Sequence, residues 1–206
     1  MFDTETLGIN AWLHISTKMN INVTKELALK LLGLNWESNK KMLFQELGEF
    51  DYNYARELFG EYLKKNIDEQ GTPIKRGLIE LLDFLDEMGM KKAIATSSQY
   101  CDAMYYIEKA GIRSRFDEIV TGDMVENGKP NPDIFLYTAK LLNTAPENCI
   151  VLEDSYNGVK AAHAAKMIPI MIPDLIQPND EILPLLYCKL HSLSEVIGLI
   201  MKLRSN

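Results

Sequence analysis

The spacing of hydrophobic residues changes once along the chain, near residue 71. Before this point apolar side chains recur every three or four residues, which is the spacing of one face of an α-helix. The clearest groups are Trp12, Leu13, Ile15 and Met19; Leu27, Leu31 and Leu32; Met42, Leu43 and Leu47; and Tyr54, Leu58, Phe59 and Leu63. We therefore predict a small helical bundle whose aromatic and methionine side chains form its core.

Beyond a turn-rich segment at 71–77, short apolar runs alternate with helical patterns. The predicted helices are 78–88, 100–110, 132–142, 159–166 and 194–203. The predicted strands are 92–96, 116–120, 148–152 and 168–172. Strands that alternate with helices form parallel sheets through right-handed crossovers. The pattern therefore predicts an α/β fold with a Rossmann-like parallel sheet.

The composition excludes several classes of function. The 206 residues are 47% hydrophobic and 25% charged, which is ordinary for a globular protein, and the net charge of −7 argues against a nucleic-acid partner. No apolar run approaches the ~18 residues of a membrane span, and the first residues lack the pattern of a signal peptide. The three cysteines show no metal-site spacing. We expect a cytoplasmic protein with no membrane partner.

Two adjacent carboxylates, Glu153 and Asp154, directly follow the predicted strand 148–152. The carboxyl ends of strands are where ligands bind in open α/β sheets, and paired acids there are costly unless a cation shares them. Mg²⁺, which prefers oxygen ligands, is the expected cation. The alternative is that Asp154 or Ser155 only caps the next helix, which leaves Glu153 unexplained.

Two other strand ends should lie at the same edge of the sheet. Thr96, Ser97 and Ser98 follow one strand, and their hydroxyls and the following helix start could cradle a phosphate; Ser98 could equally be a simple helix cap. Lys129 lies between Gly128 and a double-proline turn, although most lone lysines are solvated surface residues. Hydroxyls, a fixed cation and a metal site are together what phosphoryl transfer needs.

These three segments, together with their order and spacing, resemble the second, third and fourth motifs of the haloacid-dehalogenase-like hydrolase superfamily. They read Ala95-Thr96-Ser97-Ser98, Gly128-Lys129-Pro130-Asn131-Pro132-Asp133 and Leu152-Glu153-Asp154-Ser155. The likeness is greatest to phosphatase and β-phosphoglucomutase-like members with a helical cap. It implies a cap at 6–70 and an α/β core at 1–5 and 71–206.

The resemblance implies a Mg²⁺-dependent phosphomonoester hydrolase acting on a small phosphorylated metabolite. Thr96 would hydrogen-bond the phosphoryl oxygens with help from the Ser97 backbone, and Lys129 would neutralise charge. Asp154 would bind Mg²⁺ directly, with Glu153 sharing or supporting that site. The loop Gly33-Leu34-Asn35 is a candidate reader of the leaving group, with Asn35 as its polar side chain; a purely structural loop is an equal alternative.

Two departures from the family matter. Phe2-Asp3-Thr4-Glu5 resembles the segment just after the first motif, so that motif's nucleophile and acid–base aspartates, and the first core strand that carries them, would lie before Met1. Either the chain is a fragment or it is a shortened protein without the nucleophile. Family mutases also carry a histidine where this chain has Gly8, which favours a phosphatase.

Three functions therefore remain open. The first is a phosphatase, the second a phosphosugar mutase, and the third a catalytically silent domain that binds Mg²⁺ or a phosphorylated ligand. One further expectation concerns a helix end. Lys166 stands where relatives place a glycine, and a left-handed conformation there would cost about 1 kcal/mol.

Overall fold

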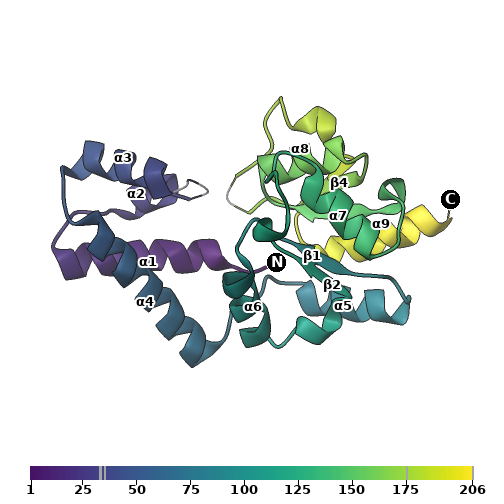
Figure 1. Cartoon of the computed structure of the whole chain (residues 1–206), viewed down its shortest axis with the longest axis horizontal. Coiled ribbons are helices and arrows are strands. Elements are labelled where there is room, and N and C mark those ends of the chain that lie inside the picture. Colours follow the sequence, from purple (N-terminus) through teal and green to yellow (C-terminus); the bar gives the residue numbers. More distant parts are fainter. Residues whose placement is uncertain (33, 35, 175, 206) are drawn as a thin grey trace. The chain divides into compact units, whose positions relative to one another are not determined.

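The computed structural model describes residues 1–32, 34, 36–174 and 176–205, and the chain divides into two compact units (Figure 1). The units are Met1–Ile74 and Lys75–Asn206. Among the described residues, no helix is both long enough and apolar enough to cross a membrane. The two units are described in turn.

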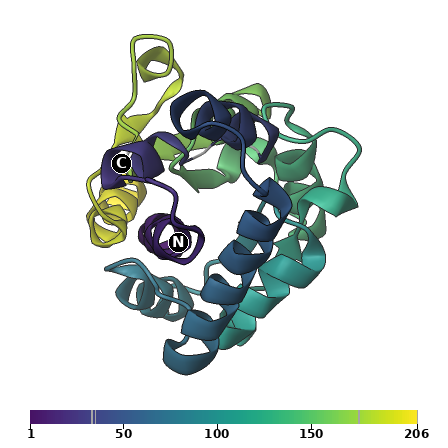
Figure 2. The ribbon, with the colours of Figure 1, turned by 90° about the vertical axis from the view of Figure 1, so that its left-hand side faces the viewer.

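The first unit is helical, as the hydrophobic spacing predicts. Its helices are α1 (Thr4–Met19), α2 (Lys25–Lys30), α3 (Trp36–Leu47) and α4 (Tyr52–Gln70). Helix α1 contacts both α2 and α4, and Figure 1 shows α2 and α3 above α1 with α4 crossing below it. In Figure 2 α1 is seen nearly along its axis, in purple.

The core of this unit is aromatic and aliphatic. Trp12 is 3% exposed and lies 5.4 Å, ring centre to ring centre, from Phe59. Ile15 and Leu43 are fully buried in the same cluster. The predicted aromatic core is therefore confirmed. Both ends of the unit are joined by backbone pairing, because the Asp3 amide donates to the Pro73 carbonyl at 2.9 Å.

The described residues of the second unit form two parallel sheets. Its strands are β1 (Ala93–Ala95), β2 (Glu118–Val120), β3 (Ile150–Glu153), β4 (Ile168–Met171) and β5 (Cys188–Lys189). One sheet pairs β1 with β2, and the other has the order β3-β4-β5. The predicted α/β class with parallel strands is confirmed. Strand β5 was not predicted, because two residues are too few to show a pattern.

Helices hold the two sheets together. They are α5 (Leu78–Glu87), α6 (Tyr100–Lys109), α7 (Asp133–Leu141), α8 (Tyr156–Ala164) and α9 (Leu193–Ser205). Helix α7 packs on β1 and β2, α8 packs on β3 and β4, and α5 packs on α9. One core cluster unites Val120 of β2, Val151 of β3, Phe135 of α7 and Ala161 of α8. The predicted helices are all present, with ends displaced by a few residues.

The predicted division into a cap at 6–70 and a core at 1–5 with 71–206 differs slightly from the two compact units. Residues 1–5 lie in the first unit, where Phe2 forms an antiparallel bridge with Ile74. Which segments act as cap and which as core stays a prediction, because compactness alone does not assign a role.

Lys166, just after α8, adopts the left-handed conformation, which the sequence left open, with φ at 60°. Its amide donates to the His163 carbonyl at 3.0 Å, and the next amide, of Met167, donates to Ala162 at 3.1 Å. This is the usual way of ending a helix with a left-handed residue, a position that glycine fills without steric cost.

We expect Lys166→Gly to raise the free energy of unfolding by about 1 kcal/mol, since it removes the left-handed penalty. Urea denaturation measures it. Lys140→Gly, within α7, is the matched control and should lower the free energy of unfolding by about 1 kcal/mol, because glycine is a poor helix former. A loss of stability in Lys166→Gly would contradict the expectation.

Candidate active site

Thr96 directly follows strand β1 and begins a polar loop. Its amide donates to the Val120 carbonyl at 3.0 Å, which prolongs the β1–β2 pairing by one residue. Its hydroxyl accepts a hydrogen bond from the Ser98 amide at 3.2 Å and lies 3.2 Å from the Ser98 hydroxyl. Ser97 and Ser98 are exposed, whereas Thr96 is half-buried. The loop is therefore folded around the Thr96 side chain and presents hydroxyls to solvent.

A second segment, at the end of β2, supports this loop, and sequence reasoning missed it. The Gly122 amide donates to the Ser98 carbonyl at 2.9 Å. A Cβ atom on Gly122 would lie 2.5 Å from the Ser97 carbonyl oxygen, so only glycine permits this approach. The signal in the sequence was a glycine directly after a predicted strand, next to Thr121 and Asp123.

Asp123 in this segment is held in its charged form. The Thr121 hydroxyl donates to it at 2.6 Å, and this hydrogen bond holds the pKa of the Asp123 carboxyl below its ordinary value. The other carboxylate oxygen accepts from the Tyr100 amide at 3.3 Å, at the first residue of α6. The sequence suggested that amides at this helix start could cradle a phosphate. The Tyr100 amide is not available for that, because it already donates to Asp123.

Lys129 reaches from its loop to both sheets. Its ammonium nitrogen Nζ lies 3.1 Å from the Ala95 carbonyl oxygen of β1 and 2.5 Å from Oε1 of Glu153 at the end of β3. It also lies 4.7 Å from the centre of the Phe135 ring. The side chains of Lys129 and Glu153 are each 9% exposed. The buried ammonium of Lys129 thus joins the end of β1, directly before Thr96, to the end of β3 at Glu153.

Glu153 is fixed from several sides. Its second carboxylate oxygen accepts from the Ser155 hydroxyl at 3.0 Å, and Ser155 in turn accepts from the Gly158 amide at 3.0 Å as the cap of α8. A Cβ atom on Gly158 would lie 2.0 Å from the carboxyl carbon of Glu153. The position of this carboxylate therefore requires a glycine in the first turn of α8.

Asp154 differs from Glu153 in being exposed, and no ion pair joins it to another described residue. Within the described part of the chain, no cluster of three or more His, Cys, Asp and Glu side chains could hold a metal. Mg²⁺ in proteins needs only one or two carboxylates and completes its shell with water and substrate phosphate. Asp154 therefore fits as a Mg²⁺ ligand, while Glu153 is already the partner of Lys129.

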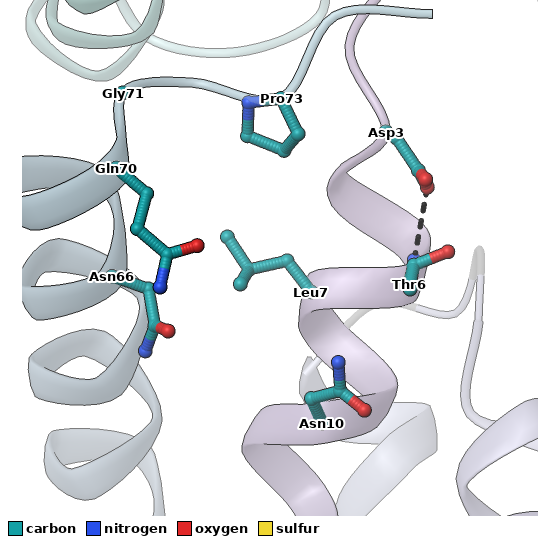
Figure 3. Close-up of a pocket in the computed structure, with 8 residues that line it drawn as sticks. All are labelled: Asp3, Thr6, Leu7, Asn10, Asn66, Gln70, Gly71 and Pro73. Carbon is teal, nitrogen blue, oxygen red and sulfur yellow. Dashed lines mark hydrogen bonds between the residues drawn. The ribbon is translucent and has the colours of Figure 1, made fainter.

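The first unit has a small polar hollow of its own, between α1 and α4 (Figure 3). Its volume is about 200 Å³, and Leu7 points into it between the amide side chains of Asn10 on α1 and Asn66 and Gln70 on α4. The predicted leaving-group residue Asn35 lies outside the described residues, as does Gly33, so that prediction is untested.

Comparison with known proteins agrees with this arrangement. The haloacid dehalogenase-like hydrolase family matches residues 1–172. A phosphorylated carbohydrates phosphatase of Thermotoga maritima is 30% identical over 167 residues, which are 80% of this chain and 76% of that protein. A β-phosphoglucomutase of Bacillus subtilis is 29% identical over 203 residues, which are 90% of this chain and 88% of that protein.

A crystal structure of a Thermotoga maritima protein superposes with a TM-score of 0.85 at 25% identity, covering 98% of this chain and 94% of that one. The fold and the expected class, a phosphoric monoester hydrolase, are both confirmed at the level of the family. The chain belongs to the haloacid dehalogenase-like hydrolase family, in the branch of phosphatases and β-phosphoglucomutase-like enzymes.

Proposed function

We propose that this site hydrolyses a small phosphorylated sugar or related metabolite with the help of Mg²⁺. The observation that carries the proposal is the position of Lys129, whose buried ammonium lies beside both the Thr96 loop and the Glu153–Asp154 pair. A phosphoryl group held there would meet a fixed positive charge in a partly dry environment, where electrostatic stabilisation is strongest. The relatives named above act on phosphorylated carbohydrates or are named for a phosphosugar.

Each residue has a distinct task in this proposal. The Thr96 hydroxyl and the Ser97 backbone donate hydrogen bonds to phosphoryl oxygens, and Lys129 offsets their charge. Asp154 is the carboxylate that would hold Mg²⁺, which would supply Lewis-acid polarisation of the phosphoryl group. Glu153 positions Lys129 through their ion pair. The attacking group expected from the family is an aspartate of the first motif. In the register set by Phe2-Asp3-Thr4-Glu5, that aspartate would lie before Met1.

Replacing Asp154 with asparagine tests the metal role. We expect the variant to lose activity by a factor of about 10²–10³, because a metal ligand contributes several kcal/mol to charge stabilisation. Phosphate release from hexose, pentose and hexitol phosphates in MgCl₂ measures it. The assay uses a form in which an apolar strand ending in Asp-x-Asp precedes Met1. Asp180→Asn, the same change at another exposed carboxylate, should leave the rate unchanged.

Two outcomes would redirect the proposal. Unchanged hydrolysis by Asp154→Asn would remove Asp154 from the mechanism. Isomerisation of a hexose phosphate in the presence of its bisphosphate, without free phosphate, would indicate a mutase. The phosphatase is favoured because Gly8 stands at the position where family mutases carry a histidine. Gly8 lies buried in α1, and a Cβ atom added to it would lie 3.6 Å from the Phe59 ring.

A further inference from the structure

The loop that follows β1 is held by the segment that follows β2. The Thr96 loop comprises residues 96–99, and the opposing segment contains the short helix η2 (Gly122–Met124). The Gly122 amide donates to the Ser98 carbonyl at 2.9 Å, and a Cβ atom on Gly122 would lie 2.5 Å from the Ser97 carbonyl oxygen. The two segments therefore lie in direct backbone contact.

The Asp123 carboxylate adds a second connection. One of its oxygens accepts from the hydroxyl of Thr121 at 2.6 Å, and Thr121, directly after β2, is fully buried. The other oxygen accepts from the amide of Tyr100, the first residue of α6, at 3.3 Å. In the described part of the chain, the side chain of Gln99, the residue before α6, makes no such cap. Asp123 thus caps a helix from another strand end, and the Thr96 loop is attached twice.

These two attachments act on the groups that are proposed to bind the phosphoryl group. The Thr96 hydroxyl accepts from the Ser98 amide at 3.2 Å, and a hydroxyl that accepts one hydrogen bond keeps its own proton to donate. Ser97 lies between these two residues. The proposed tasks of the Thr96 hydroxyl and the Ser97 backbone therefore depend on the loop keeping this fold, because a displaced Ser98 would no longer orient the hydroxyl.

The charge of Asp123 is by itself unfavourable for phosphate binding. A carboxylate repels a phosphate bound nearby, and the hydrogen bond from Thr121 holds the pKa of the Asp123 carboxyl below its ordinary value, so the charge persists. Asp123 is also exposed and so adds little by burial. A negative group in this place favours phosphate binding only through the backbone geometry that it fixes.

We propose that Asp123 is a positioning residue for phosphate binding, which acts by holding the Thr96 loop in place through the Tyr100 amide. Asp123 itself does not contact the phosphoryl group. The Gly122–Ser98 hydrogen bond holds the same loop from the neighbouring residue. This inference rests on the proposed function, in which Thr96 and Ser97 bind the phosphoryl oxygens.

The variant Asp123→Ala removes both side-chain hydrogen bonds. We expect the full chain carrying it to bind inorganic phosphate in MgCl₂ about tenfold more weakly, measured by calorimetry. The sign of the change is decisive, because removing a negative charge would by itself strengthen the binding of an anion. Amide exchange measured by NMR should also quicken at least about tenfold at Tyr100, whose hydrogen bond is lost.

Asp102→Ala is the matched control. Asp102 is an exposed carboxylate in the first turn of the same helix, so its replacement removes the same charge from the same helix start. This variant should bind phosphate no more weakly than the unaltered chain, because the contacts of Asp123 with Thr121 and Tyr100 remain.

Asp123→Asn separates the shape of the side chain from its charge. Its carbonyl oxygen can accept from the Tyr100 amide, and its NH₂ group can donate to the Thr121 hydroxyl oxygen. This neutral variant should therefore recover most of the phosphate affinity lost in Asp123→Ala. Urea denaturation of each variant shows whether stability and affinity change together, and a purely structural role would lower stability while leaving affinity unchanged.

Three results would overturn the inference. They are phosphate binding by Asp123→Ala as tight as that of the unaltered chain or tighter, an equal loss of affinity in Asp102→Ala, and a loss of stability in Asp123→Ala without a loss of affinity. Failure of the proposed function looks different. A chain that binds phosphate, loses this binding in Asp123→Ala and yet releases no phosphate from sugar phosphates in the activity assay fails only the proposed hydrolysis.

Discussion

Replacing Lys129 with methionine is expected to lower the free energy of unfolding by about 3–5 kcal/mol, because Glu153 would keep a buried charge without its partner. The two side chains are each 9% exposed, so water cannot easily replace the lost ion pair. Methionine retains most of the length of the lysine stem and removes only the ammonium group, with its ion pair and its position over the Phe135 ring. The loss can therefore be assigned to the charge. Urea denaturation of the full chain measures it.

A double variant distinguishes this cause from simple loss of packing. Adding Glu153→Leu to Lys129→Met removes the buried charge and should recover most of the lost stability. The matched control is Lys160→Met, which breaks the exposed pair of Lys160 with Glu181 at 2.6 Å. This pair should contribute no more than about 1 kcal/mol. Equal losses in the Lys129 and Lys160 variants would contradict the assigned role of Lys129.

Gly158→Ala is expected to lower stability by about 1–3 kcal/mol, the usual cost of overpacking, although alanine normally stabilises a helix. The new methyl group would lie 2.0 Å from the Glu153 carboxyl carbon. The carboxylate could move away only by giving up its contacts with Lys129 and Ser155. In the form used for the activity assay, in which an apolar strand ending in Asp-x-Asp precedes Met1, the rate of phosphate release should also fall. The reason is that the Glu153 carboxylate, which positions Lys129, would be displaced.

Gly198→Ala in α9 is the matched control for this prediction. Gly198 also lies within a helix of the second unit, but nothing lies within 4 Å of its Cβ direction. Alanine there should raise the free energy of unfolding by about 1 kcal/mol. If both variants are stabilised, the carboxylate of Glu153 is not held as tightly as its contacts indicate.

Much of the fold could be predicted because its signals are local. The helical spacing up to residue 70, the short apolar runs and the turn at 71–77 are each set by neighbouring residues in the sequence. The left-handed conformation of Lys166 stayed open in the sequence, because helix ends vary, and the structure decided it. Strand β5 escaped prediction because a two-residue strand has no pattern of its own.

The sequence supplied candidate site residues, whose roles stay predictions, but it did not supply their contacts. Thr96, Lys129, Glu153 and Asp154 were chosen because the carboxyl ends of parallel strands share one edge. The support given by Gly122 and Asp123 was missed, since a glycine after a strand has many meanings until the opposing carbonyl is known. The different roles proposed for Glu153 and Asp154 also could not be separated from the sequence, because they depend on which of the two carboxylates contacts Lys129.

The sequence by itself determined the element types and the parallel arrangement, because these follow from local periodicity and topology. Only the tertiary structure decided that Lys129 pairs with Glu153 and leaves Asp154 exposed, and that the strands pair in the orders β1-β2 and β3-β4-β5. The reason is physical. Ion pairs and strand neighbours join residues far apart in the chain, and their geometry is set by how the helices pack the two sheets together.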